Sequence, residues 1–300
     1  MPYGHHNVYV RRNDAKDKFG WGFGKKAVNW FPIDPYQFYD LPRIASDFIF
    51  NGPFYPEKPV FDETSGIITM GSCFAQRIRE WIKRRGNAAE FVHVPTGLNN
   101  SFAIRQYVEW VMTGNRSQDA YWYDDPTGLW VPPEEQQKAK AAFEAAKGFV
   151  ITFGLAEVWR DKDTGGVFWR GIPNEIFNAE KHECVVSKVS ENVENMKRIH
   201  ELLGGKTLIY TLSPIPLKAT FLERPAFISD CVSKSTLRVA LEEFFNTKPD
   251  NAFYWPAFEF FRWVGSHTKT AMMIDRHDTR GIDERCVEIV LDNFAKRYFQ

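Results

Sequence analysis

Short apolar runs alternate with amphipathic segments along the chain from residue 66 onward. The runs are rich in β-branched and aromatic residues, which predicts buried strands. In the segments between them, apolar residues recur every three or four positions, as on a helix that buries one face. This alternation predicts an α/β fold in which a mostly parallel sheet carries helices on both faces. The expected strands are 66–70, 90–94, 148–153, 206–212 and 252–256, and the expected helices are 73–85, 102–112, 134–147, 187–203, 233–245 and 283–297.

Residues 1–65 lack this alternation. Prolines and aromatic residues follow one another irregularly there, as in NWFPIDPYQFY at 29–39 and NGPFYPEKP at 51–59. Prolines at this density interrupt helices and central strands. We therefore expect an extended N-terminal arm over 1–65, which packs on the main domain through its aromatic residues, and a main domain over 66–300.

Small and polar residues follow several of the predicted strands. The stretch GSCFA at 71–75 places Ser72 and Cys73 between a strand that ends in glycine and a helix. Many hydrolase folds present a nucleophile in this way. Gly154, Ser213 and Asp275 also follow strand-like runs or lie near a strand end. Because sites in parallel sheets form outside the carboxyl ends of the strands, we expect these turns to share one edge.

Charge and cysteine usage argue against several classes of function. Lys plus Arg and Asp plus Glu both number 38, so no net field attracts nucleic acid or an anionic membrane. No apolar run reaches the length of a membrane span, and the start of the chain has no secretory pattern. The four cysteines are scattered, without the spacing of a zinc site. We therefore expect no bound metal and a cytoplasmic protein with reduced thiols.

Six ordered blocks between residues 66 and 297 resemble the GSCFA domain family. The first is GSCFA itself at 71–75, and the last is the acidic-plus-histidine element DRH at 275–277. That family is grouped with the SGNH, or GDSL-like, hydrolases, which are three-layer α/β/α esterases and acyltransferases. The resemblance implies a flavodoxin-like sheet and acyl-ester chemistry, often on cell-surface glycans. The blocks between are TFGLAEVW at 152–159, TLSPIPL at 211–217, SKSTLR at 233–238 and YWPAFE at 254–259.

Two neighbouring residues compete for the role of nucleophile. In GDSL-type enzymes the serine lies two residues after the glycine that ends the first strand, and here that place belongs to Cys73. A cysteine at a helix N-terminus gains thiolate character, because unpaired N–H groups favour negative charge. Ser72 matches the enzymes by residue type, and it is also suited to cap the helix. In a third interpretation Cys73 is structural, Ser72 only caps, and no catalysis occurs.

The resemblance implies that His277 takes the nucleophile's proton and later returns it. In GDSL-type enzymes the supporting aspartate lies three residues before this histidine, where the chain has Ile274. Asp275 would then support His277 in an altered geometry, or the site is a dyad. His93 and His267 are rival bases that are better explained as structural or solvent-facing.

Oxyanion donors are expected from the backbone N–H groups after Gly71 and from the turn at Gly154. GDSL-type enzymes carry an asparagine two residues after that second glycine, where this chain has Ala156. Asn100 is the first candidate for the missing amide and Asn99 the second. The alternative role for Asn100 is an Asx-turn before a helix.

Further residues near the same edge, including Gly71, are candidates for substrate contact. Glu157 lies in an apolar segment, where it would line a pocket or pair with an arginine. Ser213 opens a loop whose prolines fix φ and shape a pocket at low entropic cost. Trp159 can stack on a sugar face, although core packing explains a tryptophan equally well.

Together these features predict an acyl esterase or O-acyltransferase that acts on an ester or thioester of a glycan or glycan precursor. No cofactor is expected, although a cytoplasmic address favours an acyl-CoA donor. The first alternative is a non-catalytic glycan-binding or assembly module, since fold does not fix function. A second alternative is a thiol-dependent amidase. The sequence does not determine the acyl group, the acceptor or the oligomeric state.

Overall fold

A computed structural model describes residues 31–32, 35–52, 55–92, 98–115, 120–121, 133–168, 172, 174–268 and 280–300. Its centre is a parallel sheet of five strands in the order β2-β1-β4-β8-β9. These strands are β1 (Ile67–Gly71), β2 (Ala89–Phe91), β4 (Gly148–Phe153), β8 (Thr207–Leu212) and β9 (Ala252–Trp255). Numbered among themselves, the five follow the flavodoxin-like order 2-1-3-4-5. The predicted fold class is confirmed.

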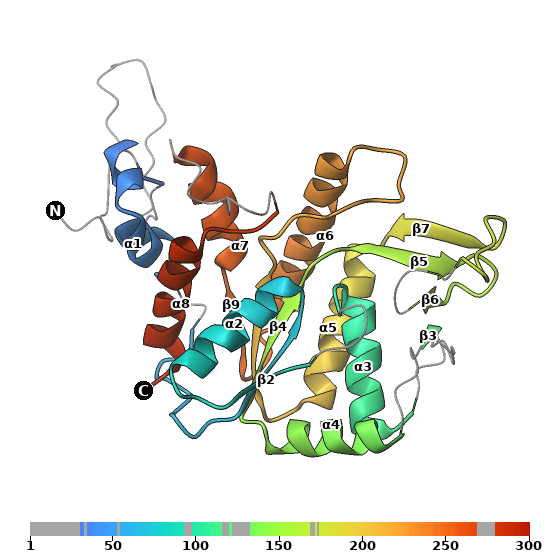
Figure 1. The fold of residues 1–300 in the computed structure, drawn as a ribbon, viewed down its shortest axis with the longest axis horizontal. Coiled ribbons are helices and arrows are strands. Elements are labelled where there is room, and N and C mark those ends of the chain that lie inside the picture. Colours follow the sequence, from blue (N-terminus) through green and yellow to red (C-terminus); the bar gives the residue numbers. More distant parts are fainter. Residues whose placement is uncertain are drawn as a thin grey trace.

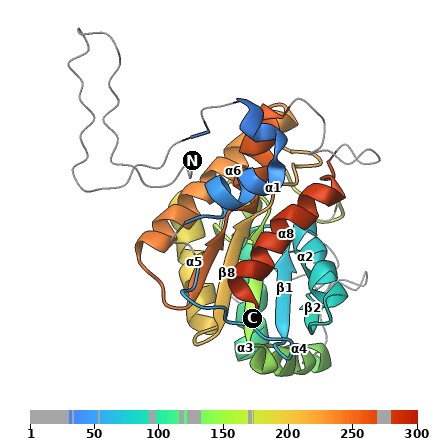
Figure 2. The same ribbon diagram turned by 90° about the vertical axis from the view of Figure 1, so that its left-hand side faces the viewer.

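Helices cover both faces of this sheet (Figure 1). On one face lie α2 (Cys73–Arg84) and α8 (Glu284–Tyr298). Figure 2 shows α8 crossing in front of the sheet and α2 beside β1 and β2. The other face carries α3 (Ser101–Thr113), α5 (Val189–Leu202) and α6 (Ala226–Asn246). The helix α4 (Pro133–Ala145) leads into β4 at the amino end of the sheet.

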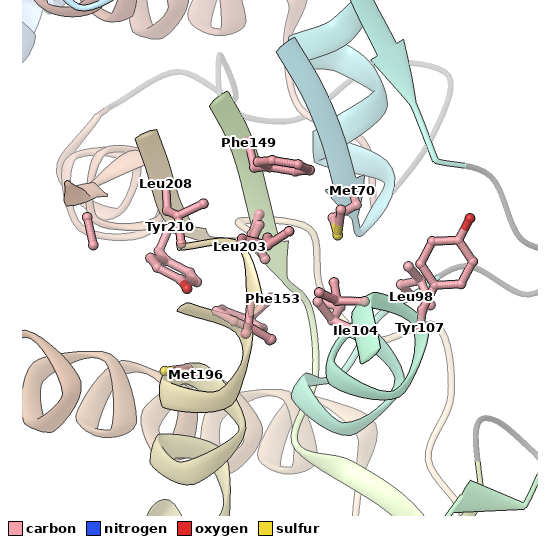
Figure 3. Packing of buried hydrophobic residues seen from close by; sticks show 14 of the residues in the cluster. Met70, Leu98, Ile104, Tyr107, Phe149, Phe153, Met196, Leu203, Leu208 and Tyr210 are labelled. Atoms are coloured by element: carbon pink, nitrogen blue, oxygen red, sulfur yellow. The ribbon is translucent and has the colours of Figure 1, made fainter. Parts of the chain in front are cut away.

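Side-chain alternation along the strands explains the two covered faces. Ile67, Val150 and Ile209 belong to the core beneath α2 and α8, whereas their neighbours in sequence enter the opposite core. Figure 3 shows Met70 of β1 pointing toward Ile104 of α3 in that second core. Each such buried apolar side chain contributes about 1.5–3 kcal/mol to folding.

The described part of the N-terminal arm contains short helices, whereas its prolines predicted an irregular chain. Its described elements are η1 (Pro35–Tyr39), α1 (Leu41–Ile44) and η2 (Ala45–Ile49). Proline is tolerated in the first turn of a helix, where its missing N–H has no partner to lose, and Asp40 caps α1 by accepting from the Arg43 amide. Phe50 then stacks on Trp255, with ring centroids 4.3 Å apart. The arm thus joins the core beneath α8.

A smaller sheet beside the main one was not predicted. Its order is β3-β6-β5-β7, from β3 (Ala120–Tyr121), β6 (Val167–Phe168), β5 (Glu157–Asp161) and β7 (His182–Val186). Only a turn at Gly154 was predicted in this region, because β5 pairs antiparallel with β7 across an intervening segment and no local pattern specifies that pairing. Three short elements follow β9, namely α7 (Ala257–Glu259), η3 (Phe260–Val264) and η4 (Gly265–His267).

Within the described part of the chain, every helix is too short or too polar to cross a bilayer.

Candidate functional site

The candidate site lies where the strand order reverses. β1 is flanked by β2 on one side and by β4 on the other, so the chain turns in opposite directions after these strands. In doubly wound sheets, ligands bind outside the carboxyl ends of the strands at this switch point. Gly71 of β1 is paired in register with Thr152 of β4, so the turns after both strands emerge side by side.

The turn after β1 requires glycine. Gly71 has φ of +121°, and a Cβ added there would lie 2.0 Å from the carbonyl oxygen of Thr152. The next amide, of Ser72, donates to that same oxygen at 3.1 Å. The chain therefore bends tightly against β4 before the helix α2 begins.

Ser72 and Cys73 occupy different positions in this turn. Ser72 is the N-cap of α2, is 6 % exposed, and accepts a hydrogen bond from the Phe74 amide at 3.3 Å. Cys73 is the first residue of the helix, and its free thiol is exposed. The structure thus gives Ser72 the capping role that the sequence analysis held as an alternative.

The other three cysteines are also free, but two of them are poor nucleophiles. Burial, followed by the charge of Glu157, raises the pKa of Cys184 to about 12. Burial likewise raises the pKa of Cys286 to about 11. Both side chains therefore remain protonated at neutral pH. Cys231 on α6 is exposed, as Cys73 is, and serves as a natural control.

The turn after β4 brings Gly154 against Ser72. A Cβ added at Gly154 would lie 3.2 Å from the Ser72 Cβ and 3.7 Å from the Asn99 Cβ. The Gly154 amide donates to the Asn99 carbonyl at 2.7 Å, and the Leu155 amide donates to the same oxygen at 3.0 Å. Three candidates from distant parts of the sequence, Ser72, Asn99 and Gly154, therefore come together at this turn. The Gly154 amide is already hydrogen-bonded to the Asn99 carbonyl.

The two asparagines before α3 differ in what they do. Asn100 is the N-cap of α3, where its side-chain oxygen accepts from the Ala103 amide at 2.8 Å. Asn99, the second candidate from the sequence, contacts the Gly154 turn. Of the two asparagines, Asn99 is thus the one that contacts the turn after β4.

The β4 turn is also held from α6, by two residues that sequence reasoning left without a role. The Ser233 hydroxyl accepts from the Ala156 amide at 2.5 Å, and the Lys234 ammonium donates to the Gly154 carbonyl. Burial lowers the pKa of Lys234 to about 7, while Asp230 raises it and Arg262 and Arg280 lower it further. Both residues lie in the SKSTLR block at 233–238, and that block was the available signal.

The candidates for substrate contact are spread along this edge. Glu157 is buried, and both its carboxylate oxygens accept from the Thr220 hydroxyl, at 3.0 and 2.9 Å. Ser213 is fully buried and accepts from the Ile215 amide at 3.3 Å within the proline-rich loop. Trp159 of β5 packs its ring 5.0 Å from Phe221 and 5.5 Å from Phe177, measured between ring centroids.

The predicted base and its support lie outside the described residues. His277, Asp275 and the rival base His93 all fall in such segments. His267 stacks on Phe38 of the arm with ring centroids 5.0 Å apart, and its Nδ1 lies 2.8 Å from the Trp263 carbonyl oxygen. Over the ranges that the structure describes, no three His, Cys, Asp or Glu side chains are grouped to hold a metal ion.

Comparisons with solved structures find distant similarity. A GDSL-like lipase from Bacteroides thetaiotaomicron is 12 % identical with a TM-score of 0.43, over 86 % of this chain and 97 % of that one. A proposed acylhydrolase from Bacteroides fragilis is 9 % identical with a TM-score of 0.40, over 87 % and 92 %. A carbohydrate esterase family 2 enzyme with a carbohydrate-binding domain, from Corynascus thermopiles (Myceliophthora fergusii), is 12 % identical with a TM-score of 0.35, over 82 % and 68 %.

No curated protein matches the sequence. The model of the GSCFA family matches residues 66–294, which span the main sheet and most of α8. This match covers well over half of the chain and includes both turns that meet at Ser72 and Gly154. The chain therefore belongs to the GSCFA family.

Proposed function

We propose that this protein is an acyl esterase or O-acyltransferase in which Cys73 is the nucleophile. One observation carries the choice: the Cys73 thiol is exposed at the switch point, while Ser72 beside it is buried as the helix cap. A nucleophile must reach its substrate, and the exposed side chain meets that requirement. Cys73 is also the first residue of α2, next to the backbone N–H groups of the helix N-terminus.

The reaction would proceed in two acyl-transfer steps. Cys73 Sγ attacks the carbonyl carbon of an ester or thioester, and His277 takes the thiol proton and delivers it to the leaving group. A hydroxyl of the acceptor, or water, then releases the acyl group from Cys73 with His277 acting as base. Asp275 would orient His277, in the roles that the sequence implies for both.

The developing oxyanion needs donors that are in place before the reaction. In this proposal they are the Cys73 amide at the start of α2 and the side-chain amide of Asn99, with Asn100 as the alternative. The contact of Asn99 with Gly154, and of Gly154 with Ser72, supports this assignment. Gly154 then serves as the close-packed turn that allows these groups to meet.

The acceptor in this proposal is a glycan or a glycan precursor. The support is an aromatic surface of Trp159, Phe177 and Phe221 on and beside the smaller sheet. Phe221 is 73 % exposed and Phe177 is 44 % exposed, and both stand edge-on to the Trp159 ring. Exposed aromatic faces of this kind bind the apolar faces of sugars. The donor is proposed to be an activated acyl thioester in the cytoplasm, such as acyl-CoA.

Covalent labelling tests the nucleophile. A thiol-selective electrophile should label wild type and Ser72→Ala, but not Cys73→Ser, and the labelling should weaken in His277→Ala. Cys231→Ser is the control, because it removes the other exposed thiol and should leave the fast labelling unchanged. Ser72→Ala should instead cost about 1 kcal/mol of stability, as the loss of a helix cap does.

The labelling sites and rates distinguish the possible outcomes. Fluorophosphonate labelling that is lost in Ser72→Ala would show that Ser72, and not Cys73, is the nucleophile. Absence of any label that depends on His277 would contradict the catalytic proposal. Glycan binding that persists without labelling, and is lost in Trp159→Ala, would favour the non-catalytic module, which the exposed aromatic surface also supports.

A further inference from the structure

A lysine is buried directly behind the candidate site. Lys234 is 2 % exposed on α6, and its ammonium donates to the carbonyl oxygen of Gly154. Burying an ammonium group is costly, and an apolar side chain of similar length would fill the same space without that cost. The presence of lysine at this place therefore calls for a reason other than core packing.

The turn that Lys234 contacts lies between Asn99, Ser72 and the helix α6. On one side, the Gly154 and Leu155 amides hold the carbonyl of Asn99. Gly154 also packs against Ser72. On the other side, Lys234 holds the Gly154 carbonyl and Ser233 holds the Ala156 amide. Any shift of this turn would move Asn99 and the cap of α2 together.

The same part of α6 also fixes the neighbouring loop after β8. Asp230, one turn before Lys234, accepts from the Leu217 amide at 3.0 Å and from Arg262 of η3 at 2.6 Å. Arg280 donates to the carbonyl of Pro216 at 3.2 Å. Among the residues that the structure describes, Asp230, Arg262 and Arg280 are the charged groups that act on Lys234. The lysine thus lies between two loops at the carboxyl edge of the sheet.

We propose that Lys234 is a positioning residue for acyl transfer, whose charged ammonium holds the Gly154–Ala156 turn so that Asn99 and the start of α2 keep their places. This inference rests on the proposed function for its effect on the rate, but the positioning itself does not depend on the chemistry. Because Lys234 is 2 % exposed and donates to the Gly154 carbonyl oxygen, the role assigned to it is to hold the turn, without proton transfer to a reacting atom.

The lysine is close to its titration point at neutral pH, because burial lowers its pKa to about 7. Below that pH the ammonium binds the carbonyl oxygen by a charge-assisted hydrogen bond, whereas above it a neutral amine binds more weakly. The hydrogen bond from Lys234 to the Gly154 carbonyl should therefore weaken as the pH rises through about 7.

Lys234→Met tests the proposal, since methionine preserves the length of the side chain and removes the charge. In the full-length variant, hydrogen exchange of the Gly154 and Leu155 amides should be about tenfold faster, with α5 amides unchanged. The rate of Cys73 labelling should also fall by about tenfold, since misplaced groups lose rate steeply. The ratio of wild-type to variant labelling rates should shrink between pH 6 and pH 8, because the two proteins share every other reacting group and only wild type has Lys234.

Each outcome decides the question. Unchanged exchange at Gly154 and Leu155 overturns the proposal, and a ratio of labelling rates that is constant with pH reduces Lys234 to a packing residue. If wild type is not labelled at all, the proposed function fails. The variant-to-wild-type ratio of hydrogen-exchange rates, compared at pH 6 and pH 8, still tests whether Lys234 holds the turn. Should Lys234→Met fail to fold, Lys234→Gln takes its place, because its amide keeps a donor near the Gly154 carbonyl.

Discussion

The turns after β1 and β4 meet at the same edge but are stabilised differently. The first is capped by its own sequence, since Ser72 accepts from an amide two residues later and Cys73 begins α2 directly. The second is held by side chains 77 and 80 positions away, those of Ser233 and Lys234, which bind Ala156 and Gly154. The helix cap of the first turn is thus encoded locally, whereas the second turn is held by contacts that only the assembled fold can form.

This difference separates two kinds of sensitivity to mutation. Changes at the β1 turn should act on the backbone and on the stability of the whole sheet. Changes around the β4 turn should act through buried polar groups, whose cost depends on losing one partner of a hydrogen bond. Three predictions follow this division, in order of decreasing effect.

Gly71→Ala should be the most damaging change. Its Cβ would meet the Thr152 carbonyl oxygen at 2.0 Å in a backbone with φ of +121°, so the β1–β4 pairing must shift. We expect a loss of about 4 kcal/mol in the free energy of unfolding, measured by urea denaturation. Gly86→Ala is the matched control: its φ is +89° but nothing lies within 4 Å, and it should cost only about 1 kcal/mol. Equal losses would show that conformation alone, and not contact with β4, governs the first turn.

Lys234→Met should change how stability depends on pH. The pKa of Lys234 falls from 10.5 to about 7 on folding, so between these values the unfolded chain binds more protons than the folded one. Wild type therefore gains stability as the pH rises through this window, by up to about 1.4 kcal/mol per pH unit, while below it the cost of burying the charge is fully present. The variant lacks this gain, so the two stability curves should diverge between pH 7 and pH 9. Parallel curves would contradict the burial of a titrating lysine.

Ser233→Ala should have a smaller effect that does not depend on pH. It removes the acceptor at 2.5 Å from the Ala156 amide and leaves a buried N–H unpaired, which costs about 2 kcal/mol. Ser235→Ala on the same helix is the control, because Ser235 is exposed. We expect the control to stay within about 0.5 kcal/mol of wild type in the same unfolding experiment. A neutral result for Ser233→Ala would mean that the β4 turn is held mainly by Asn99.

The main sheet was predictable because its strands and helices carry strong periodic signals. The expected strand at 148–153 is β4 as observed, and the expected helix at 73–85 differs from α2 only at its end. Elsewhere the local signal was misleading. The helix α6 begins at Ala226 instead of 233, because its first turns carry exposed apolar residues such as Phe227 that break the amphipathic pattern. The smaller sheet depends on pairing between β5 and β7, which no local pattern specifies.

The candidate site was predictable in part for the same reason. The strand–glycine–cap–helix order of residues 67–73 identifies the β1 turn, and the observed cap bears out the alternative role of Ser72. The choice between Asn99 and Asn100 was beyond the sequence, because both precede the same helix. Only the fold shows that one caps α3 and the other binds the Gly154 turn.

The sequence by itself determined the α/β alternation, the position of the β1 turn and the family, because these depend on periodicity, on glycine geometry and on residues close together in the chain. The tertiary structure alone decided which cysteines are exposed and which asparagine contacts the Gly154 turn. It also decided that a lysine from α6 is buried behind that site. Each of these depends on burial and on contacts between segments far apart in sequence, and a buried charge acquires its shifted pKa only when the surrounding chain removes it from water.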